Sequence, residues 1–583
     1  MDFFSILTMV GGLALFLFGM DYMGDGLKKL SGGQLESILG KLTSNRIKGF
    51  LLGLLVTAVI QSSSATTVML VGFVNSGIMS LSQTIAIIMG ANVGTTVTAW
   101  LLSTTGISGD VFWLKILKPD SFTPILAAIG ILMIMVAKTD KKKSIGSILI
   151  GFAVLMFGME TMSDAMSGLK DSQVFMDILV MFKNPILGIL SGTILTAIIQ
   201  SSSASVGILQ ALSLTGAIPM STALPVILGQ NIGTTITPIL SSISGNTESK
   251  RVAISCLYIK LIGVVVICSA FYIIHSFVHF AFMDGQATVF SIAITHTLFN
   301  IFSTVILLPF CKFIEKIAML TFKETKAPGD DRFRILDDRF LSVPGFAVEK
   351  SKDLLVEMIK LTKESVDIAV DKLLNYDEQT DKYVKEQENL VDNYEDKLGS
   401  YLVKLAGHNP SAEDSNEVTA LLHIIGDVER ISDHACNLFE ASKEIYTKGI
   451  NFSDSAKKEI GIITDAIKEI VQLSADAIEY EDNAIAMKIE PLEQIVDKLK
   501  YKMKKNHIER LQNSECTIEL GFVYSDIITH IERIADHCSN IGVCILQKKK
   551  DGFEPHEYLN HVKYDGENNF IRQYDMYKQK YTM

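Results

Sequence analysis

Charged residues are scarce in roughly the first 320 residues of the chain, which consist mainly of long apolar runs, and they crowd into the remainder. This scarcity excludes a protein that is soluble throughout, because 48% hydrophobic residues over 583 residues is too apolar for an ordinary soluble multidomain protein. The net charge of -11 belongs mostly to the second half, and an acidic half argues against nucleic-acid binding. The sequence predicts a membrane half followed by a soluble half.

The absence of several known sequence motifs reduces the number of possible function classes. The seven cysteines lack the close pairing that builds a zinc site, and we expect them to be reduced thiols. There is no Walker loop, no nucleophile elbow and no His-Glu-x-x-His, so we expect no enzyme, and any step that requires energy would draw on an ion gradient. The N-terminus lacks a basic stretch and a small-residue cleavage site, which favours a first membrane span over a removed signal peptide.

Apolar runs of two lengths occur in the first half. A helix needs about 20 apolar residues to cross the hydrocarbon core. The runs 49–60 and 65–75 are too short to cross alone, and they flank the polar sequence Gln-Ser-Ser-Ser. Two half-length helices that meet at a polar tip are typical of a re-entrant hairpin, and the pattern recurs around residues 200–203. Seven runs can cross, some of them only marginally or with an interruption: 3–20, 84–103, 121–137, 145–160, 223–240, 252–275 and 287–311.

The membrane half, residues 1–322, is an internal duplication. The offset in numbering between Gln61 and Gln200 is the same as that between Asn92 and Asn231, and it also relates LFGMDYM to MFGMETM. Repeat one covers about 1–110 and repeat two about 145–311. Three crossings separate the copies, and an odd number inverts the second copy. The sequence therefore predicts an all-α polytopic membrane protein with inverted repeats and two re-entrant hairpins.

Basic residues predict the orientation of the spans. One side of this arrangement collects Lys41, Arg46, Lys48, the sequence KTDKKK at 138–143, Lys250 and Arg251. The positive-inside rule makes that side cytoplasmic. We expect a multi-pass protein of the cell (inner or plasma) membrane, with its N-terminus outside and its charged second half in the cytoplasm.

Both duplicated motifs offer ligands for ions. Each Gln-Ser-Ser-Ser ends one half-helix and starts the next, so hydroxyls, amide groups and free N–H groups converge at positive helix ends and can hold an oxyanion. Neutral oxygens in the two Asn-x-Gly-Thr-Thr sequences suit sodium. The alternative is that these small residues only let membrane helices pack closely. The candidate residues are Gln61, Ser62, Ser63, Ser64, Asn92, Thr95, Thr96, Gln200, Ser201, Ser202, Ser203, Asn231, Thr234 and Thr235.

Residues 1 to about 315 resemble the type II sodium/phosphate cotransporter family. The motifs that carry the resemblance are the two Gln-Ser-Ser-Ser tips, GANVGTT and GQNIGTT. The resemblance implies sodium-coupled uptake of inorganic phosphate, with both tips at the substrate and sodium sites and the two Asn-x-Gly-Thr-Thr sequences as companion motifs. It also implies a late-span His-x-x-Phe-Asn-like element, and AITHTLFN supplies one with His296 and Asn300. A helix-packing pair is the alternative interpretation of these two residues.

Two positions depart from that pattern. The stretch AISCLYIK aligns with AITHTLFN but has Cys256 and Lys260 where His296 and Asn300 stand. An intramembrane lysine is a functional-site candidate, although Lys260 could also snorkel or pair with a carboxylate such as Asp21 or Glu160. If Lys260 is charged beside the site, the number of coupled sodium ions could differ from that of relatives.

The second half is predicted to be helical. Residues 323–349 are charged and contain Pro and Gly, as a linker would; 350–545 show amphipathic helical periodicity without a strand pattern; and 546–583 form a polar tail to which we assign no fold. DVERISDHACN matches HIERIADHCSN, and ENLVD matches EQIVD, so this half is also duplicated. Acidic pairs four residues apart lie on one helix face, where they could form oxygen-rich metal clusters or a solvated face paired with Arg430 and Arg533. The acidic residues are Glu388, Asp392, Glu429, Asp433, Glu493, Asp497, Glu532 and Asp536.

The repeated Glu-Arg-Ile-x-Asp-His with its trailing Asn resembles the PhoU family over about residues 345–545. The resemblance implies two three-helix repeats, a divalent metal or iron cluster held by Glu-x-x-x-Asp motifs, and a regulatory role in phosphate signalling. A homodimer or a regulatory protein bound through this half would fit the same role.

Two classes of function remain open. The first is a sodium-coupled phosphate symporter that imports phosphate across the lipid bilayer by alternating access, with a regulatory cytoplasmic domain. The second is a membrane-anchored phosphate sensor that binds phosphate without transporting it. Intact paired hairpins in both repeats favour transport. Arsenate or another small oxyanion as the substrate is a third alternative.

Overall fold

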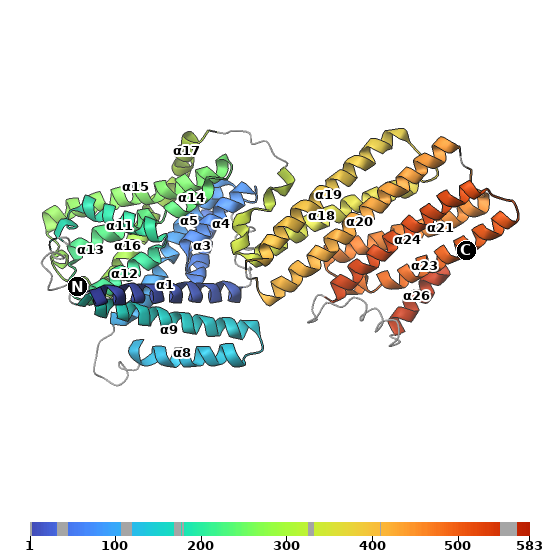
Figure 1. Cartoon of the computed structure of the whole chain (residues 1–583). Coiled ribbons are helices and arrows are strands. Elements are labelled where there is room, and N and C mark those ends of the chain that lie inside the picture. The colour runs from blue at the N-terminus through green and yellow to red at the C-terminus, as the bar shows by residue number, and fades with distance from the viewer. Residues whose placement is uncertain are drawn as a thin grey trace. The chain divides into compact units, whose positions relative to one another are not determined.

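The computed structural model describes residues 3–31, 45–106, 119–167, 177, 180–323, 331–408, 410–449, 451–547 and 568–582. The chain divides into two compact units, Met1–Phe346 (unit 1) and Ala347–Met583 (unit 2) (Figure 1). The elements described are helices, and the only strand-like pairing within the described ranges is an isolated bridge between Pro219 and Gln286. The prediction of an all-α chain is confirmed.

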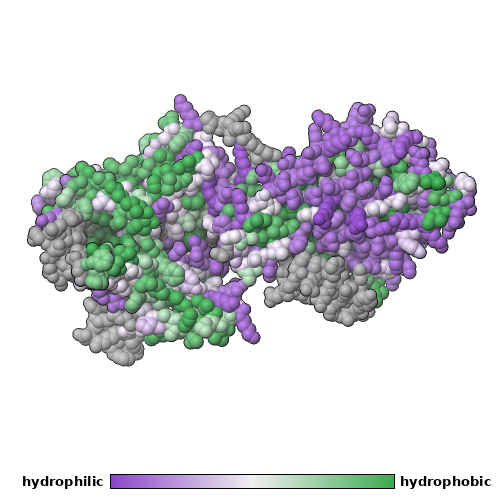
Figure 2. All heavy atoms as spheres, viewed as in Figure 1, coloured by the Kyte–Doolittle hydropathy of each residue, from purple (hydrophilic) through white to green (hydrophobic). Residues whose placement is uncertain are grey.

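Unit 1 is built from helices of very different lengths. They are α1 (Phe3–Ser31), α3 (Arg46–Ile60), α4 (Ser63–Asn75), α5 (Leu81–Gly94), α6 (Thr96–Ser103), α8 (Pro119–Val136), α9 (Asp140–Met166), α11 (Pro185–Ile199), α12 (Ser202–Leu214), α13 (Met220–Gly233), α14 (Ile236–Ser242), α15 (Thr247–Val278), α16 (Val289–Leu307) and α17 (Cys311–Thr321). Figure 2 shows hydrophobic residues over much of the surface of unit 1, as expected of a surface that faces lipid.

Within the described residues of unit 1, six helical stretches are long and apolar enough to cross a membrane. They are Phe3–Leu30, Leu81–Gly106, Asp140–Met166, Met220–Ser242, Thr247–Val278 and Val289–Thr321. The seventh predicted crossing, 121–137, coincides with the shorter apolar helix Ser121–Val136 within α8. The half-length runs form the separate helices α3, α4, α11 and α12. Lys41, one of the residues used for the orientation, lies outside the described residues.

The contact between α1 and α9 supports the inversion of the second repeat. A Cβ added at Gly19 would lie 2.6 Å from Gly151 O, and one added at Gly158 would lie 2.7 Å from Gly12 O. The offset that relates Gln61 to Gln200 makes Gly12 equivalent to Gly151 and Gly19 equivalent to Gly158. The Gly158–Gly12 contact is therefore the Gly19–Gly151 contact with the two repeats exchanged. Such a reciprocal pair of contacts is what a two-fold axis between the repeats produces.

The first half-helix of each hairpin packs on a broken span in the same way in both repeats. A Cβ at Gly53 of α3 would lie 2.1 Å from Ile87 O of α5, and a Cβ at Gly192 of α11 would lie 2.1 Å from Val226 O of α13. Glycine is needed at both positions because the backbones touch. This packing fixes the depth of each polar tip relative to the adjacent break.

The end of the predicted linker packs on unit 1, and residues 324–330 lie outside the described part. Two short 3-10 helices, η5 (Asp331–Ile335) and η6 (Asp338–Ser342), precede α18. The rings of Phe340 and Phe346 lie 5.4 and 5.0 Å from the ring of Phe73 on α4. Asn75 Nδ2 donates a hydrogen bond of 2.7 Å to Asp337 Oδ2. The linker therefore contacts the second half of hairpin one.

Unit 2 is a bundle of long helices with a hydrophilic surface (Figure 2). Its elements are α18 (Pro344–Lys372, beginning in unit 1), α19 (Glu378–Ala406), α20 (Ala412–Lys448), α21 (Asp454–Tyr480), α22 (Asn483–Ala486), α23 (Ile489–Gln512), α24 (Ile518–Gln547) and α26 (Asn568–Lys580). A buried ion pair joins two of them, because Arg510 of α23 donates two hydrogen bonds of 2.9 Å to Glu459 of α21. The last helix lies in the polar tail, for which no fold was expected.

Candidate functional site

The first polar tip lies between α3 and α4. Gln61 caps the C-terminus of α3 in the left-handed region, with φ of 59°, and its N–H donates to Thr57 O. Ser62 caps the N-terminus of α4, where its hydroxyl accepts a hydrogen bond of 3.2 Å from the N–H of Ala65. Serine is a preferred N-cap because its oxygen satisfies a free N–H of the first turn.

The second tip has the same local structure. Gln200 caps α11 with φ of 62°, and the hydroxyl of Ser201 accepts a hydrogen bond of 3.2 Å from Ala204 N–H at the start of α12. Each Gln-Ser-Ser-Ser sequence therefore ends one half-helix and starts the next, as its sequence indicates. Two N-termini with positive helix dipoles lie at the tips.

The two tips meet in space although they are far apart in sequence. Ser64 Oγ donates to Gln200 O at 3.4 Å. From the opposite side, Ser203 Oγ donates to Thr98 Oγ1 at 3.4 Å, and Thr98 Oγ1 donates to Gln61 Oε1 at 2.7 Å. Both hairpins thus contribute to one polar cluster inside unit 1.

Thr98 of α6 and Thr237 of α14 were missed in the sequence. Thr98 is 1% exposed and links the tips, and Thr237 Oγ1 donates to Gln200 O at 3.5 Å. Both could have been found, because a single residue separates each of them from an Asn-x-Gly-Thr-Thr sequence and the offset between the repeats relates one to the other. The duplicated motif therefore extends one threonine further than predicted.

The predicted sodium motifs lie at breaks between half-helices. Thr95 separates α5 from α6, while Thr234 and Thr235 separate α13 from α14. Their hydroxyls donate to carbonyls of the preceding turn; for example, Thr234 Oγ1 donates to Asn231 O at 2.7 Å. Because each hydroxyl donates its hydrogen bond to a carbonyl, its lone pairs remain free to accept a hydrogen bond or bind a cation.

Most of the predicted site residues are shielded from solvent. The buried ones are Gln61, Ser63, Thr95, Thr96, Ser202, Ser203, Asn231, Thr234 and Thr235, those of intermediate exposure are Ser62, Ser64, Asn92 and Ser201, and Gln200 is exposed. The two glutamines therefore differ, although their backbones match. The assignment of these residues to phosphate and sodium stays a prediction.

Lys260 and His296 lie on neighbouring helices of the same unit. Lys260 of α15 is 6% exposed, and its ammonium contacts Thr234 Oγ1. Of the alternatives left open for Lys260, the structure favours a position beside the site, since the ammonium is buried and contacts a threonine hydroxyl. His296 of α16 is also buried, and Asn300 Nδ2 donates to its backbone carbonyl at 2.8 Å.

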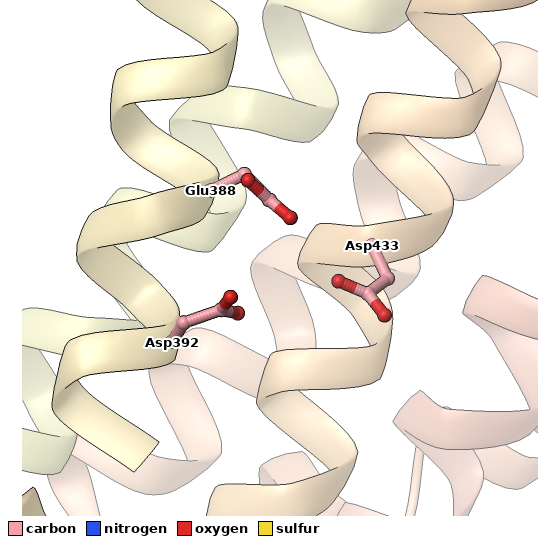
Figure 3. A group of neighbouring side chains, drawn as sticks. All are labelled: Glu388, Asp392 and Asp433. Carbon is pink, nitrogen blue, oxygen red and sulfur yellow. The ribbon is translucent and has the colours of Figure 1, made fainter. Parts of the chain in front are cut away.

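A compact group of carboxylates lies among the described residues of unit 2. Glu388 and Asp392 of α19 and Asp433 of α20 place one oxygen each within 4.8 Å of one another (Figure 3). Burial and the neighbouring carboxylates raise the pKa of Glu388 and of Asp392. Burial and Asp433 raise the pKa of Glu429 to about 7. Within the described residues, no lysine or arginine forms an ion pair with these four carboxylates.

In the duplicated acidic group of α23 and α24, two of the carboxylates have basic neighbours instead. Lys500 forms an ion pair with Glu532, and Arg533 lies 3.6 Å from Asp536. The residue of repeat one that is equivalent to Lys500 is Glu395, by the alignment of ENLVD with EQIVD. The structure thus brings Glu388, Asp392 and Asp433 together as possible metal ligands. Of the two arginines in the salt-bridge interpretation, Arg533 pairs with Glu532 and Asp536, whereas Arg430 forms no ion pair among the described residues.

Hairpins, broken spans and a two-fold relation between repeats define unit 1 as a membrane transporter. The Na+/Pi-cotransporter family model matches residues 15–164 and 154–285, and the PhoU domain model matches 355–442 and 461–545. The chain belongs to the Na+/Pi-cotransporter family and carries a PhoU domain.

Named relatives match different shares of the chain. The chain is 22% identical over 563 residues to the "Putative inorganic phosphate export protein YjbB" of Salmonella typhimurium, covering 95% of this chain and 100% of that protein. It is 30% identical to the "Uncharacterized protein YqeW" of Bacillus subtilis, over 44% of this chain and 79% of that protein. It is also 40% identical over 93 residues to the "Sodium-dependent phosphate transport protein 2A" of Rattus norvegicus, covering 15% and 14% of the two chains.

Proposed function

We propose that the protein is a sodium-coupled phosphate symporter that imports inorganic phosphate by alternating access. The observation that carries the proposal is the junction of the two hairpin tips, in which Ser64 contacts Gln200 while Ser203 and Thr98 connect to Gln61. A site shared by two inverted hairpins can be exposed to either side of a membrane when one repeat moves against the other.

Phosphate suits the tips because they offer hydrogen-bond donors at positive helix ends. The hydroxyls and the first N–H groups of α4 and α12 can bind an oxyanion, and the positive ends of these helices favour its charge. Sodium suits the oxygens at the breaks, where the negative ends of α5 and α13 favour a cation. Neutral ligands bind both ions weakly enough to release them.

Export is a second candidate for the direction of flux. It is favoured by the name of the Salmonella typhimurium relative, which aligns with 95% of this chain. A symporter runs in the direction set by the combined gradients, so an inward sodium gradient drives import. Export needs an outward driving force or a different coupling.

Proteoliposomes that contain the purified full chain test both the transport and its direction. Radiolabelled phosphate is placed outside or inside, with sodium or potassium gradients of either sign. We expect uptake that depends on inward sodium and is lost in Gln61→Ala and in Gln200→Ala. Uptake that is equal in potassium refutes sodium coupling, and release driven only by an outward gradient favours export.

The sensor alternative is tested with the same preparation. Phosphate binding to the detergent-solubilised chain without any flux in proteoliposomes would replace the transporter proposal with a sensor. Arsenate competition measures selectivity, since arsenate has the same charge and a similar shape.

We also propose that unit 2 lies in the cytoplasm and regulates transport, with one divalent cation or iron ion at Glu388, Asp392 and Asp433. Within the described residues this group forms no ion pair, whereas the duplicate group contains the Lys500–Glu532 pair. This difference supports a single metal position. Manganese titration followed by electron paramagnetic resonance should count one site per chain. Asp433→Asn should weaken it more than tenfold, whereas Glu532→Gln should not; binding of a second copy or a regulatory protein stays a prediction.

A further inference from the structure

One lysine of the membrane half, Lys260, is buried without an anionic partner in the described part of the chain. Lys260 lies near the middle of α15, is 6% exposed and forms no ion pair with any acidic residue described. Removing an unpaired ammonium from water costs several kcal/mol even after the protein relaxes. A residue held in this way needs a local environment that favours a positive charge.

The end of a half-helix provides that environment. The ammonium contacts Thr234 Oγ1 directly after the C-terminus of α13, where the helix dipole is negative. Thr234 Oγ1 donates its own proton to Asn231 O at 2.7 Å, so it can only accept from Lys260. Half-helix C-termini with free oxygens are the positions at which broken membrane helices bind sodium.

The equivalent break in repeat one has no such cation. Thr95 Oγ1 donates to Ala91 O at 3.0 Å, and no lysine or arginine is hydrogen-bonded to it among the described residues. The stretch that aligns with the surroundings of Lys260 has Asn300 in its place, and this neutral residue is 2% exposed. The two breaks therefore match in backbone and motif, but among the described residues only the break between α13 and α14 has a lysine beside its threonine.

We propose that Lys260 is a tethered cation that takes the place of a sodium ion at the break between α13 and α14. Sodium then binds at the break between α5 and α6, and each phosphate is accompanied by one sodium ion fewer than a symmetric pair of breaks would bind. The inference rests on the proposed sodium-coupled transport. It assigns to Lys260 the coupling ratio rather than the binding of phosphate.

Two substitutions separate the charge from the side-chain volume. Lys260→Asn copies the residue of the aligned stretch and supplies a neutral oxygen, while Lys260→Met keeps an unbranched side chain without charge or oxygen. Cys256→Ala, one turn earlier on the same helix, controls for packing. The readout is the ratio of radiolabelled sodium to radiolabelled phosphate taken up by proteoliposomes, together with the charge moved per phosphate.

We expect Lys260→Asn to raise the ratio by one sodium ion per phosphate and to steepen the sodium dependence of uptake. Lys260→Met should require higher sodium concentrations, because the site loses its cation without gaining a ligand, and Cys256→Ala should leave the ratio unchanged. An unchanged ratio and unchanged charge in both Lys260 variants overturn the proposal. Wild type without sodium-dependent uptake instead refutes the proposed function.

A variant that folds but does not transport is still informative. Equilibrium dialysis of the detergent-solubilised protein against radiolabelled sodium counts bound ions without any flux, after size-exclusion chromatography has shown a monodisperse sample. Lys260→Asn should bind one sodium ion more than wild type. Equal binding means that Lys260 only stabilises the break, and this result also overturns the proposal.

Discussion

The hydroxyl of Thr98 donates a hydrogen bond of 2.7 Å to Oε1 of Gln61, and Thr98 is 1% exposed. This bond joins the broken span of repeat one to the tip of hairpin one. Ser203 of the other hairpin reaches the same hydroxyl at 3.4 Å. Thr98 therefore lies at the point where three separate segments of the chain meet.

Replacement of Thr98 by valine should weaken phosphate binding. The substitution keeps the shape but leaves Gln61 Oε1 without its buried donor, and such a loss costs about 1–3 kcal/mol. We expect the phosphate concentration for half-maximal uptake to rise by roughly 5-fold to 150-fold.

A matched control is Thr84→Val, because Thr84 is also buried and its hydroxyl donates only to the local carbonyl of Leu81 at 2.8 Å. Kinetics of phosphate uptake should change little in this variant. Equal losses in both variants would mean that the effect at Thr98 is one of folding.

Truncation of Phe340 should destabilise unit 1. Its ring packs against those of Phe73 and Phe346, at 5.4 and 4.9 Å, and is 1% exposed. A buried Phe→Ala change costs about 3–5 kcal/mol, so the unfolding temperature should fall by several degrees. Tryptophan fluorescence of the full chain measures it, since both tryptophans lie in unit 1. Phe277→Ala, at a position 82% exposed, should have little effect.

The carboxyl of Glu429 should make the metal-free bundle pH-dependent. Burial and Asp433 raise its folded pKa to about 7, above the usual carboxyl value near 4.3. A raised carboxyl pKa gives stability that is present at low pH and lost as the pH rises through the folded value. Hydrogen exchange of α19 and α20 should therefore be faster relative to Glu429→Gln at pH 8 than at pH 6.

Manganese should reverse this trend, because a cation stabilises the ionised form. Binding should strengthen between pH 6 and pH 8 in wild type and much less in Glu429→Gln. A manganese affinity that is independent of pH in both proteins would contradict a role of this carboxylate beside the metal.

Replacement of Arg510 should lower the stability of the second helical repeat of unit 2 more than that of the rest of the chain. Arg510 and Glu459 are each 7% exposed, and Asn506 Nδ2 and the Tyr524 hydroxyl also donate to Glu459. Although burial raises the pKa of Glu459, these hydrogen bonds lower it below its usual value. Arg510→Met leaves a buried carboxylate unpaired and should cost about 3–5 kcal/mol.

The double variant Arg510→Met/Glu459→Met tests the origin of that cost. Removal of both charges should restore much of the stability, as hydrogen exchange of α21, α23 and α24 would show. A double variant as unstable as Arg510→Met would assign the loss to packing of the arginine side chain instead.

The sequence alone determined the helical class, the duplicated motifs and the half-length hairpins, because these depend on local composition, length and repetition. Gln61 and Gln200 could be placed at helix ends because a polar residue between two short apolar runs has few other conformations. One constant offset, kept at three pairs of motifs, was enough to relate the two halves of unit 1.

Only the tertiary structure decided which of these residues meet and which charges are paired. Thr98 joins Gln61 because α6 packs beside the tip, a contact that no local pattern encodes. Lys260 contacts Thr234 rather than a carboxylate, and Lys500 pairs with Glu532 of one acidic group, whereas its equivalent in the other group, Glu395, is itself acidic. The duplicated motifs have different surroundings, because the free energy of a buried charge depends on neighbours from distant parts of the chain.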